Sequence, residues 1–460
     1  MCVFPRIWKS AYITPIHKKG PKNEISNYRP ISKLCVIAKV FEKIVHEQLY
    51  SAVASSFTPF QHGFLRGRST VTNLTLFNDF LSEAMDRGDQ VDVVYTDYSK
   101  AFDRINYDIL LHKLCNIGIR GDLLRWFSSY IDNRSQAVVL NNYISSWITV
   151  PSGVPQGSLL GPLLFVIYVN DIASCLESSN LLCFADDMKI FTTISSFDDM
   201  KALQADLCRL ENYCVTNKLD LNPLKCSVIT YTRKRMIFNT SYTLGGQNLP
   251  KCTNTRDLGV HHDSNLLFNM HVDTIAKKAS KSLGFIMRLA KCFTEAKTLK
   301  ILYCTYVRSH LEYASQIWNP RYHKYIDRLE NIQKRFIKFL CFHQRIPYHS
   351  KDYISLCKKF HLLPLINRRE TADFMFVHKI LKNYIDCPEL LSKINFSVPS
   401  KSRRYNPIIS VPYASTNYRQ NTCVVRASSS FNILCKKHDI DPFATSVSSA
   451  RSCLSRDFFK

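Results

Sequence analysis

The stretch Leu181-Leu-Cys-Phe-Ala-Asp-Asp-Met-Lys-Ile-Phe-Thr-Thr-Ile194 decides how we interpret this sequence of 460 residues. Two largely apolar runs, 181–185 and 188–194, flank the acidic pair Asp186 and Asp187. Apolar and β-branched runs of this length predict strands, and the short break between them predicts a hairpin. We therefore expect an antiparallel hairpin that carries two carboxylates at its tip.

Upstream, another predicted strand also ends on a carboxylate. The β-branched run Val91-Asp-Val-Val-Tyr-Thr-Asp97 finishes at Asp97. The apolar residues then take helical spacing over 109–117, with Gly118 as the stop. Further on, Gly153-Val-Pro-Gln-Gly-Ser158 predicts a turn that leads into a helix over 159–169, entered at Ser158.

Carboxylates that converge from different elements are typical of a site for divalent cations. Two such cations lie about 4 Å apart and repel each other, so several carboxylates are needed to hold them. Asp97 and the pair Asp186-Asp187 converge if their strands are neighbours in one sheet. Oxygen ligands favour Mg²⁺ over zinc. The alternative interpretation of the Asp-Asp pair is an exposed turn.

Composition and charge limit the class of protein. Hydrophobic residues make up 46% of the chain, which is enough for a packed core and excludes a disordered protein. The longest nearly uninterrupted apolar run, Leu159 to Val169, is too short for a membrane span, which needs about 20 residues. The amino terminus lacks the layout of a secretory signal. We therefore expect a soluble intracellular protein without membrane contact, in the nucleus or the cytoplasm.

The formal net charge of +24 is distributed unevenly. Residues 1–70 contain 11 basic and 3 acidic side chains, residues 91–190 contain 7 and 10, and residues 271–370 contain 20 and 7. An acidic middle between basic flanks indicates a cation site beside surfaces that neutralise a polyanion. The alternative is a generally basic surface with random local variation.

The 17 cysteines predict neither a disulfide scaffold nor a metal cluster. Their density is low, and no Cys-x-x-Cys pair occurs. The nearest approach to a cluster is the group Cys341, His343, His349, Cys357 and His361. Its spacing matches no common zinc pattern, so we expect ordinary buried or surface side chains there.

Taken in chain order, the conspicuous segments resemble a known family. The central set is Asn27-Tyr-Arg-Pro-Ile-Ser32, Asp97-Tyr-Ser-Lys-Ala-Phe-Asp103, Gly153-Val-Pro-Gln-Gly-Ser158 and Phe184-Ala-Asp-Asp187. This set resembles the reverse transcriptase of non-LTR retrotransposons, the jockey-like branch in particular. Further similar segments are Gln61-His-Gly-Phe64 with Arg68-Ser-Thr70, Asn217-Lys-Leu-Asp-Leu-Asn222 with Lys225, Leu258-Gly-Val260, Leu311-Glu-Tyr-Ala314, Ile317-Trp-Asn-Pro320 and Leu329-Glu-Asn-Ile-Gln333. The resemblance covers nearly the whole chain.

The resemblance implies an α+β right-hand polymerase. Fingers and a palm with an antiparallel sheet would occupy residues 1–250, a primer grip and helical thumb 251–340, and a basic, mainly helical or loose region of unknown role 341–460. The implied function is an RNA-directed DNA polymerase that extends a DNA primer with dNTPs on an RNA template. Two Mg²⁺ ions, or Mn²⁺ in their place, would serve as cofactors.

The resemblance also implies which side chains carry the chemistry. Asp97, Asp186 and Asp187 would bind the metal ions, and the carbonyl side of Tyr98 would be a further metal contact. Lys225 would protonate the pyrophosphate leaving group; the alternative is a solvated lysine.

Other side chains would bind the nucleotide. Phe102 would lie beneath the incoming sugar and exclude a 2′-hydroxyl, or it is a core aromatic, or both. Arg29, together with Lys18, would grip the triphosphate. Gln156 and Gly157 would line the nucleotide pocket beside the template base.

Three segments after residue 270 have amphipathic helical spacing with basic residues on the other face. This pattern fits a thumb that holds nucleic acid by its phosphates, and ordinary solvated helices are the alternative. The predicted apolar stripes are Ile275, Leu283 and Ile286; Leu299, Leu302, Tyr306 and His310; and Ile326, Leu329, Ile332, Phe336 and Leu340.

The pattern weakens beyond residue 341. Arg368-Arg369, Arg403-Arg404 and the Ser/Asn-rich stretch 397–430 predict a loosely folded basic region, and the serine-rich pieces 428–430 and 446–455 predict connectors.

Two departures from the family matter. Its members usually carry an apurinic-type endonuclease upstream, and we expect no endonuclease domain in this chain. The beginning, Phe4-Pro-Arg-Ile-Trp8, resembles the interior of the fingers, so we expect preceding family sequence to be missing. The alternative function is therefore a catalytically silent, nucleic-acid-binding remnant, although every catalytic motif is intact. A telomerase-like enzyme or an RNA-dependent RNA polymerase is disfavoured by Phe102 and by the tail motifs.

Overall fold

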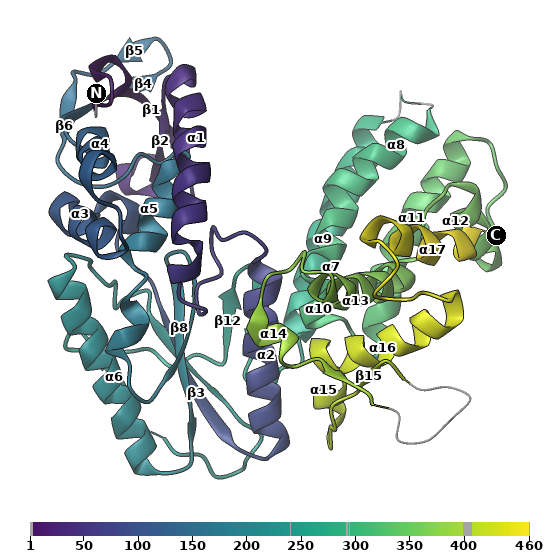
Figure 1. Ribbon diagram of the computed structural model, residues 1–460. Helices are drawn as coiled ribbons and strands as arrows, with labels where there is room; N and C mark the ends of the chain where they lie inside the picture. The colour runs from purple at the N-terminus through teal and green to yellow at the C-terminus, as the bar shows by residue number, and fades with distance from the viewer. Residues whose placement is uncertain (1–2, 240, 291–292, 294, 399–406, 460) are drawn as a thin grey trace. The chain divides into compact units, whose positions relative to one another are not determined.

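The acidic middle of the chain forms the expected sheet in the computed structural model (Figure 1). The strand order is β7-β8-β3-β9, and the strands are β7 (Asn180–Phe184), β8 (Asp187–Ile194), β3 (Gln90–Thr96) and β9 (Ser227–Tyr231). β7 and β8 are antiparallel, with Phe184 opposite Asp187. The hairpin strand β8 therefore lies beside β3, the strand that Asp97 follows directly. The predicted neighbourhood of the two strands is confirmed.

The structure describes residues 3–239, 241–290, 293, 295–398 and 407–459. They form two compact units, which we treat separately. The N-terminal unit comprises Met1–Leu65, Asp92–Val228 and Phe238–Lys251, and the C-terminal unit comprises Arg66–Val91, Ile229–Ile237 and Cys252–Lys460. This division does not test the functional regions predicted at 1–250, 251–340 and 341–460, which stay predictions.

The N-terminal unit contains a second, mixed sheet. Its order is β2-β1-β4-β5, and β6 also pairs with β4. Strand β1 is antiparallel to β2 and parallel to β4. The strands are β1 (Ser10–His17), β2 (Tyr28–Lys33), β4 (Arg134–Leu140), β5 (Tyr143–Ile144) and β6 (Ile148–Val150), and a small hairpin of β10 (Thr243–Leu244) and β11 (Gln247–Asn248) lies near the end of the unit's sequence.

Helices surround the sheets of this unit and supply its core. Helix α6 packs on β8, and the apolar helix α5 packs on α1 and α3 (Figure 1). The Ser158 hydroxyl accepts a hydrogen bond from the Gly161 amide at 2.8 Å, so it satisfies a free amide at the start of α5 as predicted. The helices are α1 (Val36–Val53), α3 (Tyr107–Asn116), α4 (Gly121–Ile131), α5 (Leu160–Tyr168) and α6 (Phe197–Thr216), with short 3₁₀ turns at Arg6–Trp8, Ile25–Asn27, Ala54–Ser56, Ala101–Asp103 and Ile172–Cys175.

The C-terminal unit is mainly helical. Its first helix, α2 (Thr70–Asp86), begins at Ser69, whose hydroxyl accepts a hydrogen bond from the Thr72 amide. The other helices are α7 (Asn269–Leu289), α8 (Ala296–Tyr303), α9 (Ser309–Glu312), α10 (Ser315–Trp318), α11 (His323–His343), α12 (Tyr353–Lys359), α13 (Leu365–Leu381), α14 (Pro388–Leu391), α15 (Asn417–Gln420), α16 (Cys423–His438) and α17 (Val447–Phe459). Short strands form the hairpin β12 (Asn254–Asp257) with β13 (Val260–Asp263) and the pair β14 (Asn395–Phe396) with β15 (Ile409–Ser410).

The three predicted amphipathic helices exist, but the stripe of the second was wrong. Tyr306 is 58% exposed, and His310 is also exposed. The buried face is instead Leu299, Tyr303, Val307 and Leu311. These residues are spaced uniformly by four, through a π-helical turn at Cys304–Arg308 that separates α8 from α9, so the buried face lies one residue later than predicted.

The prediction of loose, serine-rich connectors near the carboxyl end was also wrong. Ser428 is buried within α16, and residues 447–455 form most of α17, where Ala450 and Leu454 are buried. Ala450 and Leu454 belong to a core that also contains Phe374 and Phe431. Arg403 and Arg404 lie outside the described residues.

Two further observations concern composition. Cys341 and Cys357 are buried in the core of the C-terminal unit, whereas His343, His349 and His361 are not.

None of the described helices has both the length and the apolar character that crossing a membrane requires.

Candidate active site

The hairpin between β7 and β8 turns through two residues, Ala185 and Asp186. Asp187 is the first residue of β8 and is paired with Phe184, so only one of the two acids lies in the turn itself. Ala185 has a φ of +57°, a backbone conformation that is uncommon for residues other than glycine. The predicted hairpin tip is therefore a tight turn in which Asp186 is partly buried and Asp187 is exposed.

The segment Gln61–Phe64 holds this turn in place. The buried Gln61 amide oxygen accepts hydrogen bonds from the Ala185 amide at 2.9 Å and from the Gly63 amide at 2.8 Å. The Cys183 amide donates to the Phe60 carbonyl, and the His62 amide donates to the Cys183 carbonyl. The sequence motif was visible, but its role as a support for the acidic turn was not.

Gly63 is required because the two segments lie so close together. A Cβ atom at this position would lie 2.3 Å from the Ala185 nitrogen and 2.9 Å from the Phe184 carbonyl carbon. Both are backbone atoms of the turn that carries Asp186, so a side chain could not be accommodated without moving that turn.

Asp97 lies at the same edge of the sheet. The Thr96 hydroxyl of β3 donates to the Met188 carbonyl of β8 at 3.4 Å, which places the end of β3 beside the start of β8. The Asp97 carbonyl accepts a hydrogen bond from the Asn222 amide at 2.8 Å. The Lys225 ammonium lies 2.8 Å from the Asp97 carboxylate. The predicted Asp97 and Lys225 are thus in direct contact.

The electrostatics of Asp186 bring together the predicted cations and carboxylates. Burial raises the pKa of the Asp186 carboxyl above its ordinary value, and the nearby Asp97 carboxylate raises it further. A hydrogen bond from its own backbone, and the charges of Lys18 and Arg29, lower this pKa. Lys18 and Arg29 are therefore within electrostatic reach of the acidic turn.

Phe102 lies between the core and the surface. Its ring stacks on Phe165 with centroids 4.5 Å apart and meets Phe64 edge to face at 6.2 Å. The ring is partly exposed. One face therefore belongs to the core, as one alternative predicted, while the remaining surface is accessible.

Gln156 and Gly157 lie beside the second sheet. The Gln156 carbonyl accepts from the Ser32 amide at 2.8 Å, and its side-chain amide donates to the Asp103 carboxylate at 3.0 Å. Gly157 has a φ of +132°, and a Cβ there would lie 2.6 Å from the Ser32 carbonyl oxygen. Gln156 also lines a cavity of about 280 Å³ together with Lys100.

The Tyr98 side chain does not face this region. Its ring is 5% exposed and packs in the core of the N-terminal unit. Burial raises the pKa of its phenol well above the ordinary value. Any contact of Tyr98 with a ligand must therefore be made by the main chain, which pairs with Leu221.

The donor set suits a hard divalent cation, although the carboxylates are not assembled around one. Asp97, Asp186 and Asp187 offer only oxygen ligands, which Mg²⁺ and Mn²⁺ prefer. Among the described residues, no three His, Cys, Asp or Glu side chains are close enough together to hold a metal ion. Lys225 pairs with one oxygen of Asp97, so its ammonium competes with a cation for the charge of this carboxylate.

The comparisons with known proteins agree with this arrangement. The family model described as "Reverse transcriptase (RNA-dependent DNA polymerase)" matches residues 16–306, which include every side chain of the candidate site described above. This chain belongs to the reverse transcriptase family. Reverse transcriptases generally use divalent metal ions, in line with the carboxylate edge.

Individual relatives show which branch of the family this reverse transcriptase resembles. It is 29% identical over 349 residues to a probable RNA-directed DNA polymerase from transposon X-element of Drosophila melanogaster, covering 73% of this chain and 38% of that protein. It is 28% identical over 283 residues to the RNA-directed DNA polymerase from mobile element jockey of the same species, covering 59% and 31%. The predicted jockey-like, non-LTR relationship is confirmed. The chain thus spans well under half the length of these relatives.

Solved structures give a weaker similarity. The apo telomerase of Candida tropicalis overlaps with a TM-score of 0.41 at 14% identity, covering 77% of this chain and 62% of that chain. This overlap is too low to establish a shared fold. The mixed helix and sheet content itself agrees with the predicted α+β class.

Proposed function

We propose that this chain is an RNA-directed DNA polymerase that extends a DNA primer with dNTPs on an RNA template. The observation that carries the proposal is the edge shared by β3 and β8. Asp97 and Asp186 interact there electrostatically, and both lie within the region that matches the family. The positive charges of Lys18 and Arg29 act on the Asp186 carboxylate.

We infer that Asp97, Asp186 and Asp187 hold two Mg²⁺ ions, or Mn²⁺ in their place, with the main-chain carbonyl of Tyr98 as a further ligand. Bound there, the ions would activate the primer 3′-hydroxyl and neutralise charge on the phosphates. The raised pKa of Asp186 supports this role, because a bound cation would stabilise the charged form of a carboxylate that burial and the neighbouring Asp97 destabilise.

The basic side chains would act on the triphosphate. Arg29 and Lys18 would bind its oxygens and orient it, since both already act on the charge of Asp186. Lys225 would donate a proton to the departing pyrophosphate. Its contact with Asp97 keeps the ammonium at the site in the absence of substrate.

Phe102, Gln156 and Gly157 would shape the nucleotide pocket. The accessible part of the Phe102 ring would meet the sugar of the incoming nucleotide and exclude a 2′-hydroxyl, while Phe165 supports the ring from behind. Gln156 is held by Ser32 and Asp103, so its position beside the template base would be fixed before substrate binds.

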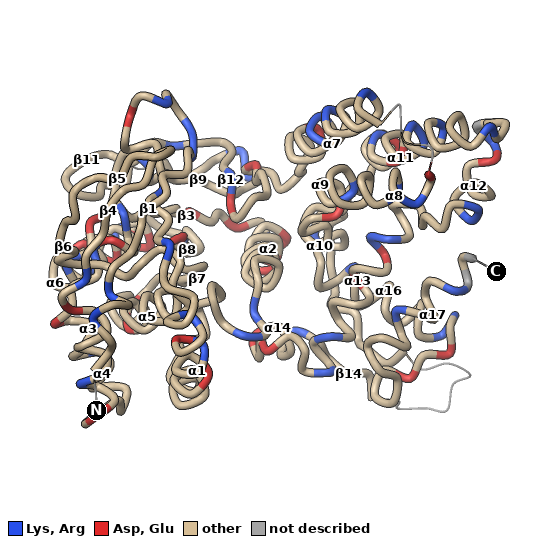
Figure 2. The backbone as a smooth tube through the Cα atoms, turned by 90° about the horizontal axis from the view of Figure 1, so that it is seen from above, with Lys and Arg blue, Asp and Glu red and all other residues tan. Residues whose placement is uncertain are grey.

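The finer architecture is part of the proposal. The mixed sheet of β1, β2 and β4 would form the fingers and the sheet of β3 and β8 the palm. Helices α7 and α11 would form a thumb, since Lys and Arg residues gather along both (Figure 2). Such surfaces bind nucleic-acid phosphates. The basic residues of 341–460 would add to RNA binding.

A primer-extension assay with the full chain tests the proposal. With Mg²⁺, an RNA template and an annealed DNA primer, the protein should incorporate dNTPs, and Asp186→Asn should abolish incorporation while leaving RNA binding intact. Asp198→Asn is the matched control, because the Asp198 side chain is 86% exposed on α6 and pairs with the exposed Lys201. Binding with steep salt dependence but without incorporation would instead identify a silent remnant.

A further inference from the structure

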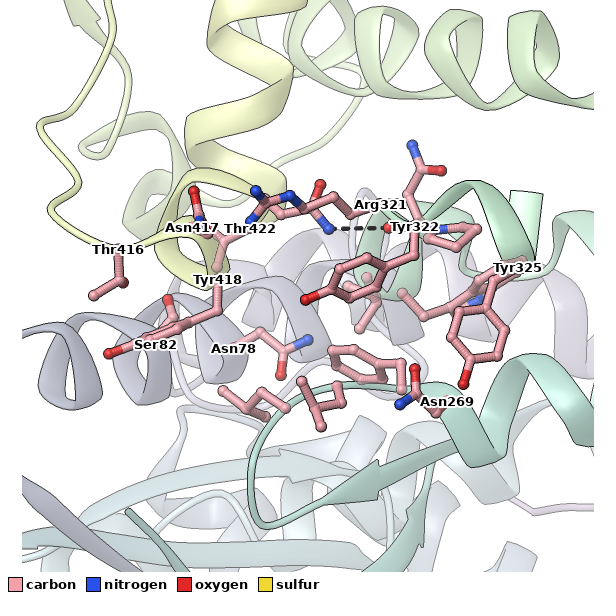
Figure 3. Close-up of a pocket in the computed structure, with 18 of the residues that line it drawn as sticks. Asn78, Ser82, Asn269, Arg321, Tyr322, Tyr325, Thr416, Asn417, Tyr418 and Thr422 are labelled. Atoms are coloured by element: carbon pink, nitrogen blue, oxygen red, sulfur yellow. Dashed lines mark hydrogen bonds between the residues drawn. The ribbon is translucent and has the colours of Figure 1, made fainter. Parts of the chain in front are cut away.

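A cavity of about 430 Å³ lies in the C-terminal unit, whereas the three aspartates belong to the N-terminal unit (Figure 3). It is enclosed by α2, by the segments after β13 and around α10, and by the segment 415–422. Its size falls within the range of about 300–1,000 Å³ that is usual for small-ligand sites. All of its lining residues belong to one unit, so the cavity does not depend on how the two units are arranged.

The base of the cavity contains an unsatisfied amide. Asn78 on α2 is only 5% exposed, and neither its side-chain oxygen nor its nitrogen has a hydrogen-bond partner. A buried amide with both groups unpaired destabilises the fold, because it has lost its hydrogen bonds to water without replacing them. Figure 3 shows this amide directed into the space below Tyr322. Such an amide needs a ligand that both donates and accepts hydrogen bonds.

Aromatic and cationic side chains form the rest of the wall. Tyr322 is 58% exposed and lines the cavity with Tyr325 and Tyr418. The Arg233 guanidinium covers the Tyr418 ring at 4.1 Å, and the exposed Arg321 guanidinium lies over the Tyr322 ring, 5.9 Å from its centroid. None of the described lining residues is acidic, so the cavity does not suit a metal ion or an amine.

Other amides of the wall are already used by the protein. The Asn421 amide donates to the Asn319 carbonyl at 3.0 Å, and the Asn319 side-chain oxygen accepts from Arg369 at 2.9 Å. These bonds fix the shape of the wall. Asn78, by contrast, is buried, and its amide has no hydrogen-bond partner among the described residues.

We infer that this cavity binds one unpaired nucleotide of a single-stranded nucleic acid. The base stacks on Tyr322, its edge exchanges hydrogen bonds with the Asn78 amide, and the phosphate lies at Arg321. Stacked aromatic rings, an amide that donates and accepts, and a guanidinium are the groups that recognise an unstacked base and its backbone. This site is separate from the proposed polymerase site and does not require incorporation.

Binding of short single-stranded oligonucleotides to the full chain tests the inference. We would measure the fluorescence anisotropy of labelled homopolymers of each base, using Asp186→Asn protein so that no extension occurs. Tyr322→Ala should weaken binding about five- to hundredfold, as expected for the loss of one stacked base. Tyr384→Ala is the matched control, since this tyrosine is 67% exposed in the same unit and does not line the cavity.

Two more variants test the individual contacts. Asn78→Leu should reduce the differences in affinity between the four homopolymers, because the leucine has nearly the same volume but cannot bond a base edge. Arg321→Ala should reduce the slope of log affinity against log salt concentration by about one. Arg451→Ala, the control, removes an exposed charge from α17 and should leave the affinity of the protein for the short single strands unchanged.

A comparison of RNA and DNA oligonucleotides shows which kind of strand supplies the nucleotide. A loss in Tyr322→Ala that is confined to RNA supports an RNA ligand, and an equal loss with DNA of the same sequence supports an unpaired nucleotide from either strand. The inference is overturned if Tyr322→Ala and Asn78→Leu both bind single strands as tightly as the parent. It is also overturned if duplex binding falls by the same factor as single-strand binding.

Discussion

Replacing Gly63 by alanine should disable the acidic turn without unfolding the protein. The added Cβ would lie 2.3 Å from the Ala185 nitrogen, whereas unstrained contacts between such atoms need about 3.5 Å. Because the obstructing atoms are backbone, the turn that carries Asp186 must shift by roughly 1 Å. A misplacement of about 1 Å at a reacting centre costs about a hundredfold in rate. Overpacking of this kind also lowers the free energy of unfolding by about 1–3 kcal/mol.

Single-nucleotide incorporation and urea unfolding would separate the two effects. We expect Gly63→Ala to lose about a hundredfold in kcat while remaining folded at low urea concentration. Gly284→Ala in helix α7 is the control, because its Cβ would meet no atom closer than 3.7 Å. It should gain about 0.5–1 kcal/mol in stability. Gly63→Ala with a kcat within twofold of the parent would refute the proposed support of the turn.

Three further predictions concern the same edge. Lys225→Met should lower the Mg²⁺ concentration needed for half-maximal incorporation, since Asp97 no longer pairs with an ammonium, and it should also reduce the maximal rate. An unchanged Mg²⁺ titration would contradict the competition between Lys225 and Mg²⁺ for Asp97. The pKa of Asp186 in the folded protein is raised above the ordinary value of 3.8, so the metal-free protein loses stability as the pH rises from 3.8 to the pKa of the folded state. Asp186→Asn should therefore increase the free energy of unfolding at neutral pH, but not at a pH well below 3.8. Urea titrations at the two pH values would measure this difference. Phe102→Ala should increase rNTP use in competition with dNTPs and cost about 2–3 kcal/mol in stability through the lost stack on Phe165; unchanged discrimination would show that the ring is only a core residue.

Much of the N-terminal unit could be predicted because its signals are local. The β-branched run before Asp97, the stop at Gly118 and the serine before α5 each act within a few residues. The second stripe was predicted one residue too early, because its buried residues follow a uniform spacing of four through a π-helical turn at 304–308, whereas the prediction used the mixed three-and-four repeat of an α-helix. The burial of Ser428 could not be predicted for another reason: composition marks serine as polar, whereas the packing of the whole helix α16 decides which of its side chains are buried.

The sequence by itself determined the chemical identity of the candidate site: three aspartates, two of them adjacent, and the basic residues Lys18, Arg29 and Lys225 in a recognisable order. Only the tertiary structure decided how these groups meet. Gln61 and Gly63 support the turn of Asp186 from a segment more than 120 residues away, and Lys225 pairs with Asp97. Only the fold, too, left the Asn78 amide without a partner in a cavity of aromatic and cationic side chains. Local sequence patterns determine which helices and strands form, whereas the distances between residues far apart in the sequence depend on how the whole chain packs.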